Sequence, residues 1–185
     1  MMIVGVVLLV VVAVAFLLSV AVYNALIGMR QAVQNGWSQI DVQLKRRHDL
    51  IPNLIEIAKG YMAHERQTLE NVVKARQQAV DASGLQDKQQ AENFLSSTLR
   101  SLFAVVENYP NLKADQQMLR LHEELTSTEN KIAFARQYYN DEVTRFNTAA
   151  QTFPNNIVAV LFNFKSYDFF EIVNPAEKEV PQVKF

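Results

Sequence analysis

The sequence has no cysteine, and it is poor in glycine, histidine and net charge. Its 185 residues include five glycines and three histidines, with a formal net charge of −1 and a pI near 6.3. The lack of cysteine excludes thiol catalysis, structural disulfides and cysteine-ligated zinc. The few glycines form neither a phosphate-binding loop nor a nucleophile elbow. The balanced charge gives no basic stripe, so we expect no nucleic-acid partner.

The three histidines do not have the spacing of metal ligands. Di-metal carboxylate bundles place Glu three residues before His on two helices, and no histidine here has Glu at that position. His64-Glu65 and His122-Glu123 each begin like a zincin helix, yet Thr occupies the place of the second histidine. We therefore interpret the histidines as structural or solvated, and expect no metal and no cofactor.

Acidic residues are present, but basic residues accompany them. A cleft for acid–base catalysis would draw on Asp41, Asp49, Glu56 and Glu129. Basic residues are available at helical spacing or on neighbouring helices: Lys45, Arg46, Arg47 and Arg136. Salt bridges are the simpler interpretation of such pairs, so we expect the protein not to be an enzyme.

A long N-terminal apolar run is the first positive feature. Ile3 to Val22 contains only apolar residues and Ala apart from Gly5 and Ser19, and the first charged side chain is Arg30. About 20 helical residues cross roughly 30 Å of hydrocarbon, so we expect a transmembrane anchor at residues 1–23. The alternative is a signal peptide cleaved after Ser19-Val20-Ala21, but the run is long for one and no basic residue precedes it. The basic residues all follow the run, which favours a cytoplasmic domain.

After this run, apolar residues recur at the three- and four-residue spacing of amphipathic helices. The pattern predicts helices at about 24–60, 65–83, 90–108 and 113–153, with Phe94 on the buried side of the third. No segment alternates like a strand. We therefore predict an all-α fold, with an antiparallel four-helix bundle of unequal helix lengths over residues 24–156. Residues 157–185 would form an apolar and aromatic segment and an extended, proline-containing tail.

Two residues are unexpected in the first predicted helix, Arg47 because it interrupts the apolar stripe and Pro52 because of its backbone. Arg47 falls where Leu or Ile is expected, so it needs a carboxylate partner on another helix, with Glu129 and Glu107 as candidates. Pro52 removes the helical hydrogen bond to the carbonyl of His48. Because the stripe keeps its phase across the proline, we expect a kinked but continuous helix, with a break just before Pro52 as the alternative.

Several motifs resemble the LemA family of bacterial membrane proteins. The likeness is carried by WSQIDVQLKRRHDLIPNL with KGY and HE over Trp37–Glu65, then ENYPNLKA, ELTSTENKIAFARQYYND, FN and FPNN in the family's order. The resemblance implies one inner-membrane helix, a helical-bundle domain and no established catalytic activity. The family usually has Gly where this chain has Asn163, a residue that tolerates left-handed backbone.

The unequal helix lengths predict an interaction surface. The second and third helices are only about 30 Å long, so residues 24–40 and 136–153 would form a two-helix segment. Its apolar residues would be exposed, and such patches usually mark interaction sites. We take Trp37, Tyr139, Phe146 and Phe153 as self-association residues, and the tail residues Pro181, Val183 and Phe185 as docking residues on an adjacent subunit. A monomer whose tail covers its own helices is the alternative.

Two classes of function remain. The first is a membrane-anchored scaffold or adaptor that self-associates laterally into a homo-oligomer. The second is a regulator of a membrane enzyme, because LemA-family proteins are often encoded beside membrane metalloproteases. In either case Ile157–Phe170 returns to the bilayer surface, where aromatic side chains sit at the headgroup level or pack on a neighbour.

Overall fold

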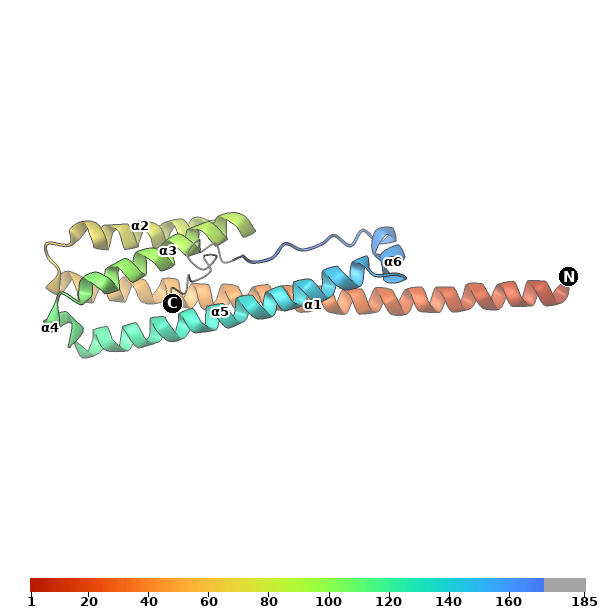
Figure 1. Cartoon of the computed structure of the whole chain (residues 1–185), viewed down its shortest axis with the longest axis horizontal. Coiled ribbons are helices and arrows are strands. Elements are labelled where there is room, and N and C mark those ends of the chain that lie inside the picture. Colours follow the sequence, from red (N-terminus) through yellow and green to blue (C-terminus); the bar gives the residue numbers. More distant parts are fainter. Residues whose placement is uncertain (172–185) are drawn as a thin grey trace, which may run out of the picture. The chain divides into compact units, whose positions relative to one another are not determined.

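The computed structural model describes residues 1–171, and its regular structure is entirely helical. In chain order the helices are α1 (Met2–Tyr61), α2 (Arg66–Asp81), α3 (Leu85–Val106), α4 (Pro110–Lys113), α5 (Gln116–Gln151) and α6 (Asn155–Leu161) (Figure 1). No strand occurs among the described residues. The all-α fold predicted from the apolar spacing is therefore confirmed.

The chain forms two compact units. One contains Met1–Ile40 and Phe134–Phe169, and we call it the anchor unit. The other contains Asp41–Ala133 with the described residues Phe170 and Glu171, and we call it the bundle unit. Both α1 and α5 contribute a part to each unit. The expected segments 1–23, 24–156 and 157–185 remain a prediction; among the described residues, Val158 and Ala159 of α6 pack with Leu26 of α1.

The bundle unit joins parts of α1 and α5 to α2, α3 and α4 around one apolar core. The core residues recur every three or four positions, so each helix buries one stripe. They are Ile51, Leu54, Ile55, Ala58, Met62, Leu69, Val72, Ala75, Ala79, Leu95, Leu99, Leu102, Val106, Leu112, Met118 and Leu125. Phe94 is 49% exposed, so its predicted place on the buried side was wrong. Leu95 and Leu99, which were also predicted on the buried side of this helix, do line the core.

Helix α1 continues through Pro52, as predicted from the phase of its apolar stripe, which is the same on both sides of the proline. The proline has no N–H, so the carbonyl oxygen of His48 has no donor within the helix. Arg76 of α2 supplies one, because its Nε donates to that oxygen over 2.7 Å. The neighbouring helix thus satisfies the carbonyl that Pro52 leaves unpaired.

In the anchor unit, α1 and α5 approach each other closely at Gly36. A Cβ atom on Gly36 would lie 3.1 Å from the Cα of Tyr139, closer than ordinary packing allows. Glycine therefore permits this contact between the two helix backbones. The surrounding buried residues are Leu26, Val33, Tyr139, Val143 and Phe146.

The chain after α6 returns along α5 as a non-helical segment (Figure 1). Asn163 lies at its start with a φ of 54°, the left-handed backbone that an asparagine tolerates. The side chain of Asn147 then holds the segment: its Nδ2 donates to the carbonyl of Tyr167 over 2.9 Å, and its Oδ1 accepts from the N–H of Tyr167 over 3.0 Å. The hydroxyl of Tyr139 donates to the carbonyl of Asp168 over 3.0 Å.

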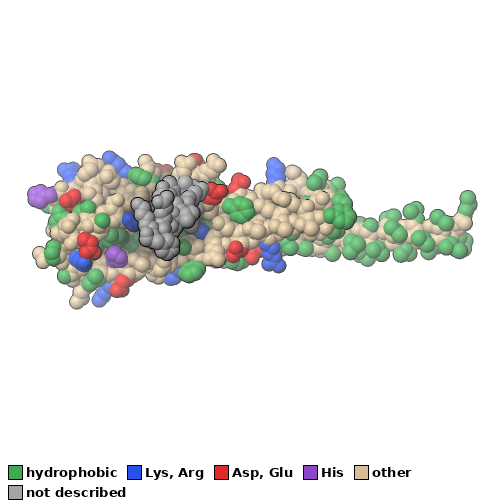
Figure 2. Space-filling view, in the orientation of Figure 1, with side chains coloured by type: hydrophobic (Ala, Val, Ile, Leu, Met, Phe, Trp, Pro, Cys, Tyr) green, Lys and Arg blue, Asp and Glu red, His purple; other side chains and the backbone are tan. Residues whose placement is uncertain are grey.

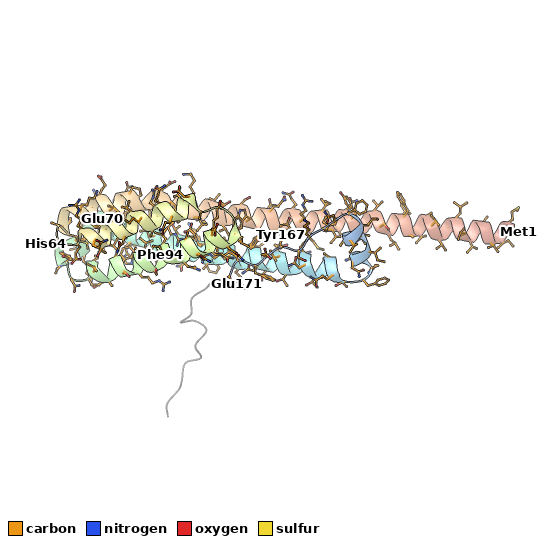
Figure 3. All side chains as sticks on the ribbon, turned by 90° about the horizontal axis from the view of Figure 1, so that it is seen from above. Met1, His64, Glu70, Phe94, Tyr167 and Glu171 are labelled. Atoms are coloured by element: carbon orange, nitrogen blue, oxygen red, sulfur yellow. The ribbon has the colours of Figure 1, made fainter. Side chains whose placement is uncertain are left out.

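The N-terminal part of α1 exposes its apolar side chains on all sides. Large apolar residues from Met1 to Val20 are exposed (Figure 2), and their side chains project from every face of the helix (Figure 3). This part is long and apolar enough to cross a membrane, which is consistent with a single-pass anchor.

Candidate functional site

A charged cluster centred on Arg47 lies inside the bundle unit. Arg47 is 1% exposed, and its Nη1 donates to Oε2 of Glu129 over 2.5 Å and to Oγ of Ser96 over 2.8 Å. Its Nη2 donates to Glu92. The Nε2 atom of His48 lies 2.9 Å from the other oxygen of Glu92. The cluster therefore joins α1 to both α3 and α5.

Glu92 is the buried carboxylate of this cluster. Its burial by itself raises the pKa, but the hydrogen bond with His48 and the charge of Arg47 outweigh burial, so the pKa of Glu92 is lowered. Replacing such a buried pair with apolar residues is often neutral, whereas removing one partner leaves an uncompensated charge. The cluster thus favours one alignment of the helices more than it adds net stability.

Only one of the two carboxylates predicted as partners of Arg47 contacts it. Glu129 reaches Arg47, whereas Glu107 forms an exposed ion pair with Lys113. Sequence reasoning missed Glu92. A signal was present, because Glu92 lies three residues before Leu95 on the buried stripe of α3, where an acidic residue is as unexpected as Arg47 is on α1.

Other acidic residues considered for catalysis form ion pairs at the surface of the bundle unit. Asp49 lies 2.6 Å from the Nζ of Lys45, and this hydrogen bond lowers the pKa of Asp49. Asp41 lies 2.9 Å from the Nζ of Lys88. Across residues 1–171, no group of three or more His, Cys, Asp or Glu side chains is placed to hold a metal ion.

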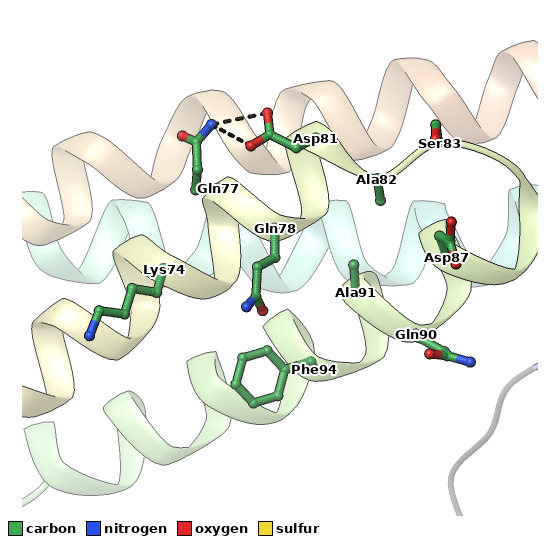
Figure 4. Close-up of a pocket in the computed structure, with 10 residues that line it drawn as sticks. All are labelled: Lys74, Gln77, Gln78, Asp81, Ala82, Ser83, Asp87, Gln90, Ala91 and Phe94. Carbon is green, nitrogen blue, oxygen red and sulfur yellow. Dashed lines mark hydrogen bonds between the residues drawn. The ribbon is translucent and has the colours of Figure 1, made fainter.

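Shallow grooves open on the surface of the bundle unit, and the two larger ones among those found over the described residues have linings that do not include the charged cluster. One of about 770 Å³ lies between α2 and α3 (Figure 4), with Asp81, Asp87 and Phe94 in its lining. Asp81 accepts two hydrogen bonds from the side-chain amide of Gln77. The other groove, of about 540 Å³, lies beside α1 and α2 and is lined in part by Lys59. Neither lining includes Arg47, Glu92 or Glu129.

The predicted self-association residues all lie in the anchor unit, but most are covered by the same chain. Tyr139 and Phe146 are 4% and 0% exposed, and the half-buried Trp37 packs edge-on against Tyr139 with ring centroids 5.7 Å apart. The ring of Tyr167 lies 5.3 Å from that of Phe146, so the segment after α6 covers this surface. Phe153 is 75% exposed. The predicted docking residues Pro181, Val183 and Phe185 all lie outside the described part of the chain.

The sequence is similar to known proteins over most of its length. It is 22% identical to the magnetosome protein MamQ of Magnetospirillum gryphiswaldense and 24% identical to the magnetosome protein MamQ 2 of Paramagnetospirillum magneticum, each match covering 80% of this chain. The chain spans 64% of the length of those two relatives. It is 26% identical to the protein LemA of Metamycoplasma hominis, over 80% of this chain and 68% of that protein.

The family comparison agrees with these matches. The LemA family is matched by residues 36–185, which include the motifs from Trp37 onward and cover well over half of the chain. The resemblance inferred from those motifs is thereby confirmed. The chain belongs to the LemA family.

Proposed function

We propose that this protein is a membrane-anchored helical scaffold or adaptor without catalytic activity, and that it associates laterally with copies of itself. The observation that carries the proposal is the Arg47 cluster. Arg47 of α1 forms ion pairs with Glu92 of α3 and Glu129 of α5, which suits a unit that must keep one fixed helix arrangement. A catalytic site would instead turn such groups towards a substrate cavity.

The place of the scaffold is part of the proposal. The exposed apolar part of α1 supports a single-pass anchor in the bacterial inner membrane, and the basic residues that begin at Arg30 support a cytoplasmic bundle unit. The magnetosome relatives are named for the structure to which they belong and not for a reaction, which agrees with a structural role.

An exposed aromatic stripe on α5 supports lateral association. Phe134 is 71% exposed and Tyr138, one helical turn later, is 39% exposed. Neighbours at this spacing lie on one helix face, so a second copy can cover both side chains at once. This stripe takes the place of Tyr139 and Phe146, which the chain itself covers.

Cross-linking in native membranes tests the proposal. Because the chain has no cysteine, a single cysteine at Gln34 or Gln151, both exposed in the anchor unit, reports only its own contacts. We expect cross-linked dimers from at least one of these positions, above the level given by a control cysteine at the exposed Gln78 of α2. Phe134→Asp should abolish the dimers while circular dichroism stays helical.

Two results would contradict lateral association. One is finding only monomer at both positions with the protein intact. The other is a stable one-to-one complex with a different protein, seen by mass measurement in mild detergent. That complex would favour the alternative, a regulator of a membrane enzyme such as a metalloprotease.

A further inference from the structure

An apolar surface of the anchor unit surrounds α6 and is not covered by the chain's described residues. The exposed fractions are 75% for Phe153, 60% for Ile157, 83% for Val160, 75% for Leu161 and 53% for Phe162. The opposite side of α6 is buried through the small residues Val158 and Ala159. The helix thus turns its larger apolar side chains outward, the reverse of a surface helix in water.

Contacts within the anchor unit place α6 where α1 leaves the membrane. Val158 and Ala159 pack with Leu26 of α1, and Val22 packs against the same cluster. The ring of Phe162 lies 4.7 Å from the ring of Tyr23. Val22 ends the apolar run, and at 1.5 Å per residue Leu26 is only about 6 Å farther along the helix. The exposed surface of α6 therefore adjoins the end of the membrane-crossing segment.

Basic residues border this apolar surface along each chain segment that forms it. No charged side chain occurs from Met1 to Met29 or from Phe146 to Phe164. The first charged side chains beyond these stretches are all basic and exposed: Arg30, Arg145 and Lys165. Each lies within four residues of a side chain in the apolar cluster around Val158 and Ala159, namely Leu26, Ala149 and Phe164. Figure 2 shows basic side chains beside this apolar end of the unit.

We propose that α6, with Phe153 and Phe162, inserts into the lipid interface of the leaflet from which α1 emerges. Arg30, Arg145 and Lys165 then lie at the depth of the lipid phosphates. The inference rests on the proposed membrane anchoring. A helix of seven residues is about 10 Å long, too short to cross the bilayer, so it lies in the interface as a second, monotopic contact. The membrane-crossing part of α1 and the inserted α6 together fix the orientation of the anchor unit at the membrane. With α1 alone, the unit could rotate about the axis of that helix.

Tryptophan fluorescence of the full chain in vesicles tests this insertion. The single tryptophan is first removed by Trp37→Phe, and Val160→Trp then places the reporter on the exposed face of α6. The vesicles contain phosphatidylcholine and phosphatidylglycerol, with or without bromine on the acyl chains. We expect the reporter's emission to be blue-shifted and strongly quenched by the brominated lipids.

Two matched reporters in the same background separate this inference from anchoring itself. Phe16→Trp lies within the apolar run and should be quenched, whereas Val80→Trp, on an exposed site of α2, should not. Quenching at Phe16 without quenching at Val160 would overturn the insertion of α6 and leave the anchor intact. An unquenched but blue-shifted signal at Val160 would also overturn it, since protein then covers the helix. Quenching at neither position would overturn the anchoring as well.

Discussion

The two units bury their shares of α1 and α5 by different chemistry. The bundle unit surrounds them with two further long helices, and its interior holds Arg47 paired with Glu92 and Glu129. The anchor unit has only the short α6 and a non-helical segment, and its interior is mostly aliphatic and aromatic, with Arg136 as a buried charged residue. Asn147 and Tyr139 donate hydrogen bonds to backbone carbonyl groups of that segment.

This difference indicates how each unit fixes its arrangement. Apolar surfaces tolerate small shifts, because the hydrophobic effect has no directional preference. A buried ion pair has no such tolerance, since a misplaced partner leaves a desolvated charge. In the bundle unit, the ion pairs of Arg47 thus specify how α1, α3 and α5 align. In the anchor unit, hydrogen bonds to backbone groups hold the segment after α6 in place.

The largest effect should follow the loss of the buried charge in the bundle unit. Arg47→Ala leaves Glu92 buried without its cation, and we expect the free energy of unfolding to fall by about 3–5 kcal/mol. Thermal unfolding measures the loss, and hydrogen exchange should locate it in the bundle unit. An unchanged midpoint would show that the cluster does not hold the helices.

A double variant separates the charge from its packing. In Arg47→Met with Glu92→Leu both members of the pair become apolar, so most of the lost stability should return. Glu129 tolerates the loss of Arg47 better than Glu92 does, because its side chain is 45% exposed. If the double variant is as unstable as Arg47→Ala, the cost arises from side-chain shape and not from an unpaired charge.

The anchor unit should show a smaller and more local effect. Asn147→Leu removes both hydrogen bonds to the backbone of Tyr167, which we expect to cost about 2 kcal/mol. Faster hydrogen exchange at the Tyr167 amide, with unchanged exchange in the bundle unit, is the expected result. Asn147→Asp is the control, because it keeps the acceptor for the Tyr167 N–H and should retain part of the protection.

Periodicity predicted the helices and the buried place of Arg47, but it did not predict all that lies around them. Arg47 stands out as a charge on an apolar stripe, and α1 keeps its phase through Pro52, so both could be inferred from spacing alone. Glu92 follows the same logic on α3 but was overlooked. The position of Phe94 was misjudged because α3 has more apolar residues than its buried face can hold.

The covering of Phe146 had no comparable signal in the sequence. It depends on a non-helical segment held by Asn147, a side chain 20 residues away from the Tyr167 backbone that it binds. The partner of Asn147 is the backbone of Tyr167, and every residue type has nearly the same backbone. Neither the hydrophobic periodicity nor the identity of residue 167 therefore predicts this hydrogen bond. The prediction from helix lengths therefore placed Tyr139 and Phe146 at the surface, whereas the structure buries both.

The smallest effect concerns the carbonyl that Pro52 leaves unpaired in the bundle unit. Arg76→Ala removes its donor from α2, and we expect the free energy of unfolding to fall by about 1 kcal/mol, the net worth of one hydrogen bond. Pro52→Ala restores a backbone N–H that can donate to His48 within α1. In that background Arg76→Ala should therefore cost much less, and a double-mutant cycle by urea unfolding measures the coupling. Equal costs in the two backgrounds would mean that Arg76 acts through other contacts, and that α2 stabilises α1 by apolar packing without compensating for the proline.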